Sequence, residues 1–314
     1  GSSVRENSAM TLFILHRRGE GQAVSSPLRP YNCRMHFEQI TVVGVGLIGG
    51  SIGLAAHARK LASRVVGVGR DIRILSRAMD LGAIDSFTID LAEGVNEANL
   101  VVVCTPVNTI ASIILRAAQH VRAGTLFTDG GSTKAKIVAE VENDLPEGVE
   151  YVPAHPLAGS EKNGVENARD DLYQNRVTIL TPTRRTDLEA VERVQEFWKA
   201  LGSRIVTMLP DEHDRVLAFT SHLPHAVASA VAGVTSPEWL KVTAGGFRDV
   251  TRIAAGDPCL WAAIFQENRE HLLSAVEAFH SRLEEFRRLL TNSDTTGLVN
   301  WLTEGKQVRD ALGN

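Results

Sequence analysis

Residues 40–51 read ITVVGVGLIGGS, and this stretch decides the fold. Its first four residues are β-branched and mostly apolar, which predicts a buried strand. Glycines at positions 44, 46 and 49 then predict a tight turn into a helix whose positive end binds a pyrophosphate. A second strand, expected at 65–68, completes the order that a dinucleotide-binding unit requires. The alternative is a purely structural glycine turn. The expected cofactor contacts are Gly44, Gly46, Leu47, Ile48 and Gly49.

Short apolar runs alternate with stretches of helical spacing as far as residue 209. The expected strands are 40–43, 65–68, 100–105, 125–128, 151–154, 177–180 and 204–208. The expected helices are 51–61, 72–81, 109–121, 134–145 and 188–201. Apolar strands separated by helices predict a parallel sheet that is covered on both faces.

After Pro210 only helical patterns follow, and 314 residues are more than a single core usually holds. We therefore expect an α/β protein, with a Rossmann-type doubly wound sheet at 37–209 followed by an all-α dimerisation domain at 210–314. Apolar residues at the spacing of a helix–helix seam are Leu272, Val276, Phe279, Leu283, Phe286 and Leu290. Such a stripe needs a partner helix. The partner belongs to the same domain, to a homodimer formed through the C-terminal helices, or to both.

Composition excludes several classes of protein. Lys and Arg number 33 against 37 Asp and Glu, so the clustered positive charge that binds nucleic acid is missing. The cysteines Cys33, Cys104 and Cys259 form no disulfide or zinc pattern, so we expect no metal and a cytoplasmic location. The apolar runs are far shorter than a membrane span. Residues 1–36 lack periodicity, and we expect a flexible extension that begins with the remnant of a tag.

The end of the second strand bears on the choice of cofactor. The chain reads GVGRD at 67–71, so Gly69 stands where an NAD enzyme usually offers a carboxylate to the ribose. Arg70 follows and can pair with a 2′-phosphate. NADP is therefore favoured, while Asp71 keeps NAD open if the strand is longer. Thr105 and Pro106, at another strand end, are also expected to line the cofactor site.

Polar segments follow the remaining strands, at the edge where open α/β sheets bind ligands. They are DGGSTK at 129–134 and HPLAGSE at 155–161, and the helical region adds His213, Ser221, His222, His225 and the segment 245–254. Taken singly, each has a structural explanation: Ser132 can cap a helix, and Arg252 can form a surface ion pair. Spacing alone predicts a nicotinamide oxidoreductase whose substrate is unassigned.

Together these segments resemble the prephenate/arogenate dehydrogenases of tyrosine biosynthesis. The motifs that carry the resemblance are GVGLIGGS at 44–51, DGGSTK at 129–134, HPLAGSEKNG at 155–164, SHLPH at 221–225, GGFRDVTRIA at 245–254 and DPCLWAAIF at 257–265. The resemblance covers residues 40–290 in order. It implies oxidation and decarboxylation of prephenate to 4-hydroxyphenylpyruvate, with hydride transfer to NAD(P).

The resemblance also implies roles for individual residues. His155 is the catalytic residue, which accepts a hydrogen bond from the C4 hydroxyl of the substrate, and Ser132 is a second polar group there. Arg252 binds a substrate carboxylate through two parallel donors, and His225 recognises the pyruvyl side chain. The other positions that line the pocket or its entrance are His213, Ser160, Glu161, Ser221, Gly245 and Trp261.

Several choices stay open. Pro224 disturbs the helix, so spacing does not decide whether His222 or His225 faces the ligand; the resemblance favours His225 and a structural His222. Prephenate is favoured over arogenate, which carries an amino group in place of the keto group. A 3-hydroxyacid-type dehydrogenase is less favoured, because 206–252 lacks a lysine at a glycine-rich helix start. An NADP-binding redox sensor without turnover would not need His155, Ser132 and Arg252.

The lengths of the two ends also bear on regulation. About 40 residues before the sheet are too few for a chorismate mutase domain, and about 24 after Leu290 are too few for a regulatory ACT domain. We therefore expect a monofunctional enzyme, in which any inhibition by tyrosine is competitive at the catalytic pocket.

Overall fold

The computed structural model describes residues 35–159 and 162–313. Most of the extension predicted at 1–36 therefore lies outside the described residues. None of the helices in these two ranges combines the length and the apolar character of a membrane-spanning segment.

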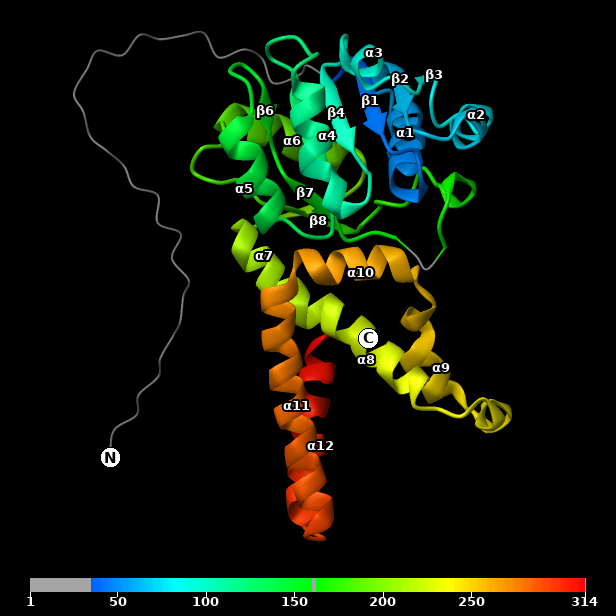
Figure 1. Ribbon diagram of the computed structural model, residues 1–314, viewed down its shortest axis with the longest axis vertical. Helices are drawn as coiled ribbons and strands as arrows, with labels where there is room; N and C mark the ends of the chain where they lie inside the picture. The colour runs from blue at the N-terminus through cyan, green and yellow to red at the C-terminus, as the bar shows by residue number, and fades with distance from the viewer. Residues whose placement is uncertain (1–34, 160–161, 314) are drawn as a thin grey trace, which may run out of the picture. The chain divides into compact units, whose positions relative to one another are not determined.

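Six strands of the described chain form a parallel sheet in the order β3-β2-β1-β4-β5-β6 (Figure 1). They are β1 (Phe37–Val43), β2 (Ala62–Val68), β3 (Ser86–Thr88), β4 (Leu100–Val103), β5 (Leu126–Asp129) and β6 (Glu150–Tyr151). The strand order reverses between β1 and β4, and ligands of open α/β sheets bind at the carboxyl ends of the strands beside such a reversal. The predicted doubly wound sheet is confirmed.

Helices and turns that connect the strands cover both faces of this sheet. They are α1 (Leu47–Arg59), α2 (Ile72–Asp80), α3 (Leu91–Val95), η1 (Val107–Thr109), α4 (Ile110–Ala118), α5 (Ala135–Asp144), η2 (Val165–Asn167) and α6 (Leu188–Ala200). Because successive strand residues point to opposite faces, Val42 packs in an apolar core with residues of α1 and α6, and Val43 packs in another with residues of α4 and α5. Both faces are therefore buried, which explains the nearly continuous apolar strands.

The remaining strands are β7 (Ala154–Pro156), β8 (Val177–Leu180) and β9 (Arg204–Thr207). They form a second sheet in which β7 is antiparallel to β8, so the prediction of one continuous parallel sheet is wrong here. The strand predicted at 151–154 is divided, because Pro153 has no N–H with which to continue a ladder. The carbonyl of Pro153 instead accepts a hydrogen bond from Thr181 N at 3.0 Å. The chain thus changes sheets immediately before His155.

The rest of the described chain is helical. Its segments are α7 (Pro210–Leu217), the π-helical turn η3 (Ala218–His222), α8 (Leu223–Gly233), η4 (Pro237–Val242), α9 (Gly245–Thr251), η5 (Arg252–Ala255), α10 (Pro258–Glu267), α11 (Arg269–Thr291) and α12 (Thr295–Ala311). The wide turn η3 lies just before Pro224. Because proline has no backbone N–H, it cannot donate the helical hydrogen bond to the carbonyl four residues back. The helix predicted to carry His213 and His225 therefore consists of three segments.

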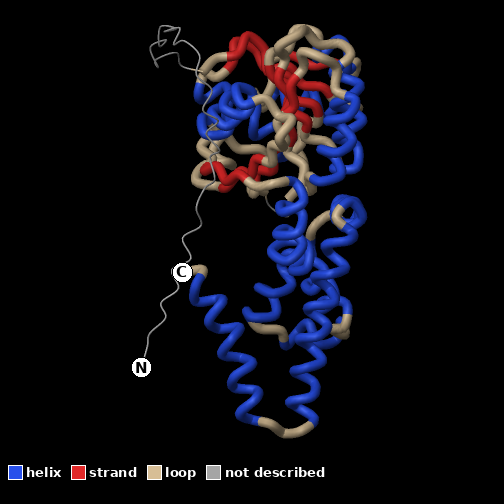
Figure 2. Tube along the Cα trace, turned by 90° about the vertical axis from the view of Figure 1, so that its left-hand side faces the viewer, coloured by secondary structure: helices blue, strands red, loops and turns tan. Residues whose placement is uncertain are grey.

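Helices α11 and α12 form a hairpin, and Figure 2 shows it at the opposite end of the described chain from the strands. Leu272, at the start of the predicted seam, is buried, but Val276 and Leu283 stay 40% and 44% exposed. Helix α12 therefore covers the seam only in part.

Candidate active site

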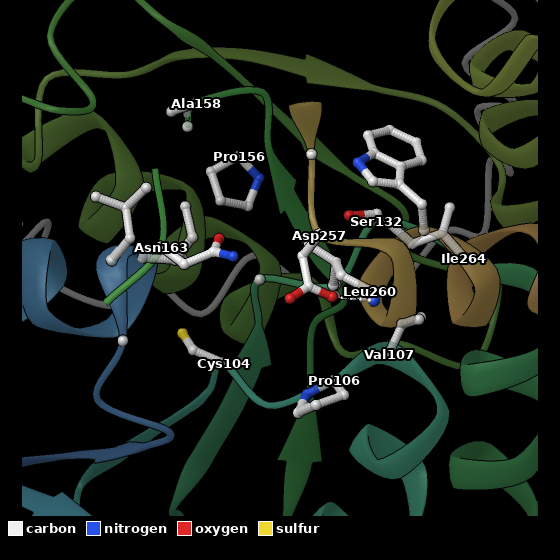
Figure 3. A pocket seen from close by; sticks show the side chains of 18 of the residues that line it. Cys104, Pro106, Val107, Ser132, Pro156, Ala158, Asn163, Asp257, Leu260 and Ile264 are labelled. Carbon is white, nitrogen blue, oxygen red and sulfur yellow. Dashed lines mark hydrogen bonds between the residues drawn. The ribbon is translucent and has the colours of Figure 1, made fainter. Parts of the chain in front are cut away.

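A cavity of about 660 Å³ lies beside the carboxyl ends of β1, β4 and β5, between the two sheets' polar segments and the helical region. Figure 3 shows Pro106, Ser132, Pro156 and Asp257 around this space. The predicted site residues in its wall are Gly46, Leu47, Ile48, Thr105, Pro106, Ser132, His155, His225, Arg252 and Trp261. Residues from distant parts of the sequence thus share one cavity.

The turn between β1 and α1 has the shape that a pyrophosphate needs. Gly44 has a φ of +94°, and a Cβ there would lie 2.7 Å from the carbonyl oxygen of Cys104, so only glycine fits. Gly46 precedes α1 without a side-chain cap, and a Cβ there would meet nothing within 4 Å. The first N–H groups of α1 have no partner inside the helix and attract anions. A Cβ on Gly49 would lie 2.8 Å from Val42, so this glycine lets α1 pack closely on β1.

A second cavity, of about 1220 Å³, continues from the same turn along the end of β2. The two cavities share Gly46, Cys104, Thr105 and Pro106, so an extended dinucleotide can run from one into the other. Three arginines line the second cavity: Arg70, Arg73 and Arg116. The sequence indicated Arg70 but not the other two, because they lie on α2 and α4, outside any glycine motif.

The carboxylate nearest the end of β2 is already engaged. Asp71 caps α2 by accepting a hydrogen bond from Arg73 N at 2.9 Å, and its Oδ2 lies 2.8 Å from the Arg73 guanidinium. The side-chain hydrogen bond from Arg73 lowers the pKa of Asp71. A side chain committed in this way is poorly placed to bind a ribose hydroxyl.

His155 lies on β7 in the wall of the first cavity, with 8% of its surface exposed. Its Nδ1 is 2.9 Å from Nε2 of His213. Burial lowers the pKa of His155 well below its ordinary value, and the neighbouring His213, Lys134 and His222 lower it further. The imidazole is therefore neutral at neutral pH, as a proton acceptor must be.

His213 is fully buried behind His155, outside the described cavity wall. Its Nδ1 lies 2.8 Å from Oδ1 of Asp214. Burial lowers the pKa of His213, although the hydrogen bond to Asp214 opposes this shift. Asp214 also accepts the backbone N–H groups of Lys134 and Ala135, each at 2.8 Å, at the start of α5. A carboxylate fixed to one helix end thus supports the two histidines.

A buried ion pair joins the main sheet to β7. The Nζ of Lys134 contacts Oδ2 of Asp129 and donates to the carbonyl of Ala154 at 2.9 Å, and both charged side chains are fully buried. Asp129 also accepts hydrogen bonds from Tyr151 OH at 2.9 Å and from the backbone N of Ala154 at 3.0 Å. Sequence reasoning missed this pair. Its only signal was the DGGSTK segment, whose lysine has the pattern of a surface residue.

The helical region supplies the cationic and aromatic side of the cavity. The rings of His225 and Trp261 stack with centroids 3.3 Å apart, and Arg252 lies at the start of η5. Burial lowers the pKa of His225 to about 4, with a smaller contribution from Arg252. His222 is buried instead, and its Nδ1 lies 3.1 Å from Asn268 Nδ2.

Some predicted positions lie elsewhere. Ser221 is half-buried on η3 and Gly245 is exposed at the start of α9, and neither is in the described cavity wall. The wide turn η3 accounts for Ser221, because it rotates the helix face on which His213 and His225 would otherwise align. Ser160 and Glu161 lie outside the described residues.

Comparison with known families gives two matches that divide the chain. Residues 52–207 match a family described as prephenate dehydrogenase, nucleotide-binding domain, and residues 209–304 match prephenate dehydrogenase, dimerization domain. Among curated proteins, the chain is 35% identical to prephenate dehydrogenase of Bacillus subtilis, over 88% of this chain and 76% of that protein. It is 34% identical to cyclohexadienyl dehydrogenase of Zymomonas mobilis, over 88% and 96% of the two chains.

Solved structures show the same likeness. A crystal structure of prephenate dehydrogenase from Aquifex aeolicus, in complex with hydroxyphenyl propionate and NAD+, matches with a TM-score of 0.82 and 34% identity, over 90% of this chain and 99% of that one. Arogenate dehydrogenase of Synechocystis matches with a TM-score of 0.73 and 28% identity, over 87% and 99%. The likeness extends over both the sheet region and the helical region.

Proposed function

The chain belongs to the prephenate dehydrogenase family and is a nicotinamide-dependent oxidoreductase, and from this premise we propose that it converts prephenate to 4-hydroxyphenylpyruvate in tyrosine biosynthesis. One observation carries the proposal: neutral His155 and cationic Arg252 line a single cavity that begins at Gly46 of the pyrophosphate turn. A dianion can therefore be held at two ends beside the cofactor.

His155 acts on the reacting end of the substrate. Its neutral imidazole accepts the proton of the C4 hydroxyl, which raises the electron density at C4 and favours loss of hydride from that carbon. The bound nicotinamide supplies the hydride acceptor. As the ring carboxylate leaves as carbon dioxide and the ring becomes aromatic, the proton returns from the imidazole to the phenolic oxygen. Ser132 is the second polar group at this end.

The opposite end of the substrate is recognised by the helical region. Arg252 binds a carboxylate, and His225, neutral and stacked on Trp261, hydrogen-bonds the pyruvyl side chain. The assignments of Ser160, Glu161, Ser221, Gly245 and His213 to the substrate pocket or its entrance stay predictions.

NADP is the proposed cofactor. Gly69 leaves the end of β2 without a carboxylate, and Asp71 is held by Arg73. Arg70, Arg73 and Arg116 give this cavity the positive charge that a 2′-phosphate requires.

The dimerization-domain match indicates a homodimer. We place its interface on α11 and α12, where Val276, Leu283 and Val299 stay between 40% and 56% exposed. Sedimentation of the enzyme at micromolar concentration tests this, and a monomer would contradict it. A cytoplasmic location, suggested by cysteine usage, remains part of the proposal.

The test of function is optical measurement of cofactor reduction with prephenate and with arogenate, each with NAD and NADP. The expected result is the highest kcat/KM with prephenate and NADP. Faster turnover of arogenate would reassign the substrate, and faster turnover with NAD would reassign the cofactor. No reduction with either substrate would overturn the proposal.

A further inference from the structure

A chain of three side chains leads from the cavity into the protein. His155 Nδ1 lies 2.9 Å from His213 Nε2, and His213 Nδ1 lies 2.8 Å from Asp214 Oδ1. His213 and Asp214 are 0% and 2% exposed, so no water competes for these contacts. The chain is anchored, because Asn268 Nδ2 donates to the carbonyl of Asp214 at 2.6 Å.

The hydrogen positions along this chain follow from its far end. Both oxygens of the Asp214 carboxylate accept a backbone N–H group at the start of α5, Oδ1 from Lys134 and Oδ2 from Ala135. An ionised carboxylate only accepts hydrogen bonds, so Nδ1 of His213 carries a proton. In neutral His213, Nε2 is then an acceptor, and Nδ1 of His155 must be the donor to it.

The surroundings of His213 favour its neutral form. The titratable groups that face it are His155 on β7, Asp214 on α7, Lys134 and Asp129 at the β5–α5 connection, and His222 on η3. Burial is the largest influence and lowers the pKa of His213, so a proton is not held on both of its nitrogens at neutral pH.

We propose that His213 and Asp214 are positioning residues that fix His155 as its Nδ1–H tautomer, so that its Nε2 lone pair faces the cavity. Nε2 of His155 has no hydrogen-bond partner among the described residues. The opposite tautomer would present an N–H to the substrate hydroxyl and could not take its proton. The inference deepens the proposed function and rests on it, because only a proton acceptor at this position makes the tautomer matter.

The tautomer is measurable without substrate. In ¹⁵N-histidine-labelled enzyme, the signals of His155 are identified by their loss in His155→Asn, and they should be those of an imidazole protonated at Nδ1. Signals of an imidazole protonated at Nε2 would overturn the inference. Because this measurement needs no turnover, it is independent of whether prephenate or arogenate is the substrate.

Variants of His213 distinguish a role in fixing the tautomer of His155 from a role in packing alone. His213→Leu fills space but offers no acceptor, so kcat should fall by at least about 10²-fold while KM changes less than about 3-fold. His213→Gln can offer its amide oxygen to His155 Nδ1, and should recover about 10-fold of that loss. Asp214→Asn places an amide donor opposite His213 Nδ1 and so can reverse the tautomers of both histidines. In hydrolases in which an aspartate fixes a catalytic histidine, the same change costs about 10⁴-fold in kcat.

The matched control is His271→Leu, which removes another imidazole that bonds to a carboxylate of α7, Asp211, and not to His155. Its kcat should stay within about 3-fold of the parent's, provided that thermal unfolding and cofactor binding show a folded enzyme. Wild-type turnover by His213→Leu, or equal losses in His213→Leu and His213→Gln, would contradict a role in tautomer selection.

Discussion

The two sides of the cavity are built differently. On the sheet side, Asp129 and Lys134 are fully buried and both are hydrogen-bonded to Ala154 of β7, and His155 is held by the buried His213 of α7. On the helical side, Arg252 is exposed and lies on η5, a turn of four residues. Chemistry at C4 needs a fixed geometry and a dry surrounding, whereas recognition of a carboxylate tolerates water. Substitutions on the first side should therefore affect folding and kcat, and those on the second should affect KM.

The largest effect is expected from Lys134→Met, which removes the cation of the buried pair on the sheet side. Asp129 would remain buried without its counter-charge, which typically costs about 3–5 kcal/mol of folding stability. Urea unfolding measures this loss. The neighbouring Lys136, whose side chain is 58% exposed and pairs with Glu267 at 3.0 Å, is the control: Lys136→Met should cost less than about 1 kcal/mol. Similar losses of unfolding free energy in the two variants would mean that burial does not make the Lys134–Asp129 pair more important than an exposed pair.

Arg252→Ala tests the other side. Without the guanidinium a substrate carboxylate loses its partner. KM should therefore rise by a factor that corresponds to a loss of about 2–4 kcal/mol of binding free energy, while the unfolding free energy stays near that of the parent. Steady-state kinetics with prephenate and urea unfolding together give the result. The control is Arg269→Ala, which removes an exposed guanidinium at the start of α11, outside the described cavity wall. A fall in kcat at unchanged KM would place Arg252 at the reacting end instead.

His155→Asn should give the reverse pattern to Arg252→Ala. It removes an interaction that grows in the transition state, so kcat should fall by about 10²-fold or more with little change in KM. A rise in KM without loss of kcat would show that His155 only binds substrate.

The pH profile of the parent enzyme sharpens this prediction. An unperturbed imidazole loses its neutral form below about pH 6.5. Because burial lowers the pKa of His155, kcat/KM should stay constant down to pH 6.5 and fall only in more acidic buffer. The fall assigned to His155 should vanish in His155→Asn.

Folding stability should also fall in acid. Buried histidines such as His222, with its pKa lowered to about 4, bind fewer protons in the folded state than in the unfolded state. Stability should therefore decline from about pH 6.5 toward 4.

The same contrast explains what the sequence could predict. The strand, glycine turn and helix at 40–51 are a local pattern, and the parallel sheet and pyrophosphate turn followed from it. The change of sheets at Pro153 could not be predicted, because it depends on which strand β7 pairs with. Lys134 was overlooked for a similar reason: nothing in DGGSTK reveals that its lysine is buried. The contact between His213 and His155 joins residues 58 apart in the sequence and depends on how α7 packs on α5, which local spacing does not anticipate.

The smallest effect is expected at the far end of the second cavity, where discrimination between NADP and NAD depends on exposed charges. Arg70 forms no ion pair within the described residues, and an exposed charged contact is worth about 1 kcal/mol. Arg70→Ala should therefore raise KM for NADP about 5-fold and leave KM for NAD nearly unchanged. Arg73→Ala should shift the preference further toward NAD, because it also releases Asp71. The free carboxylate would repel a 2′-phosphate and accept a hydrogen bond from a ribose hydroxyl. Equal changes in both KM values would mean that neither arginine reads the phosphate.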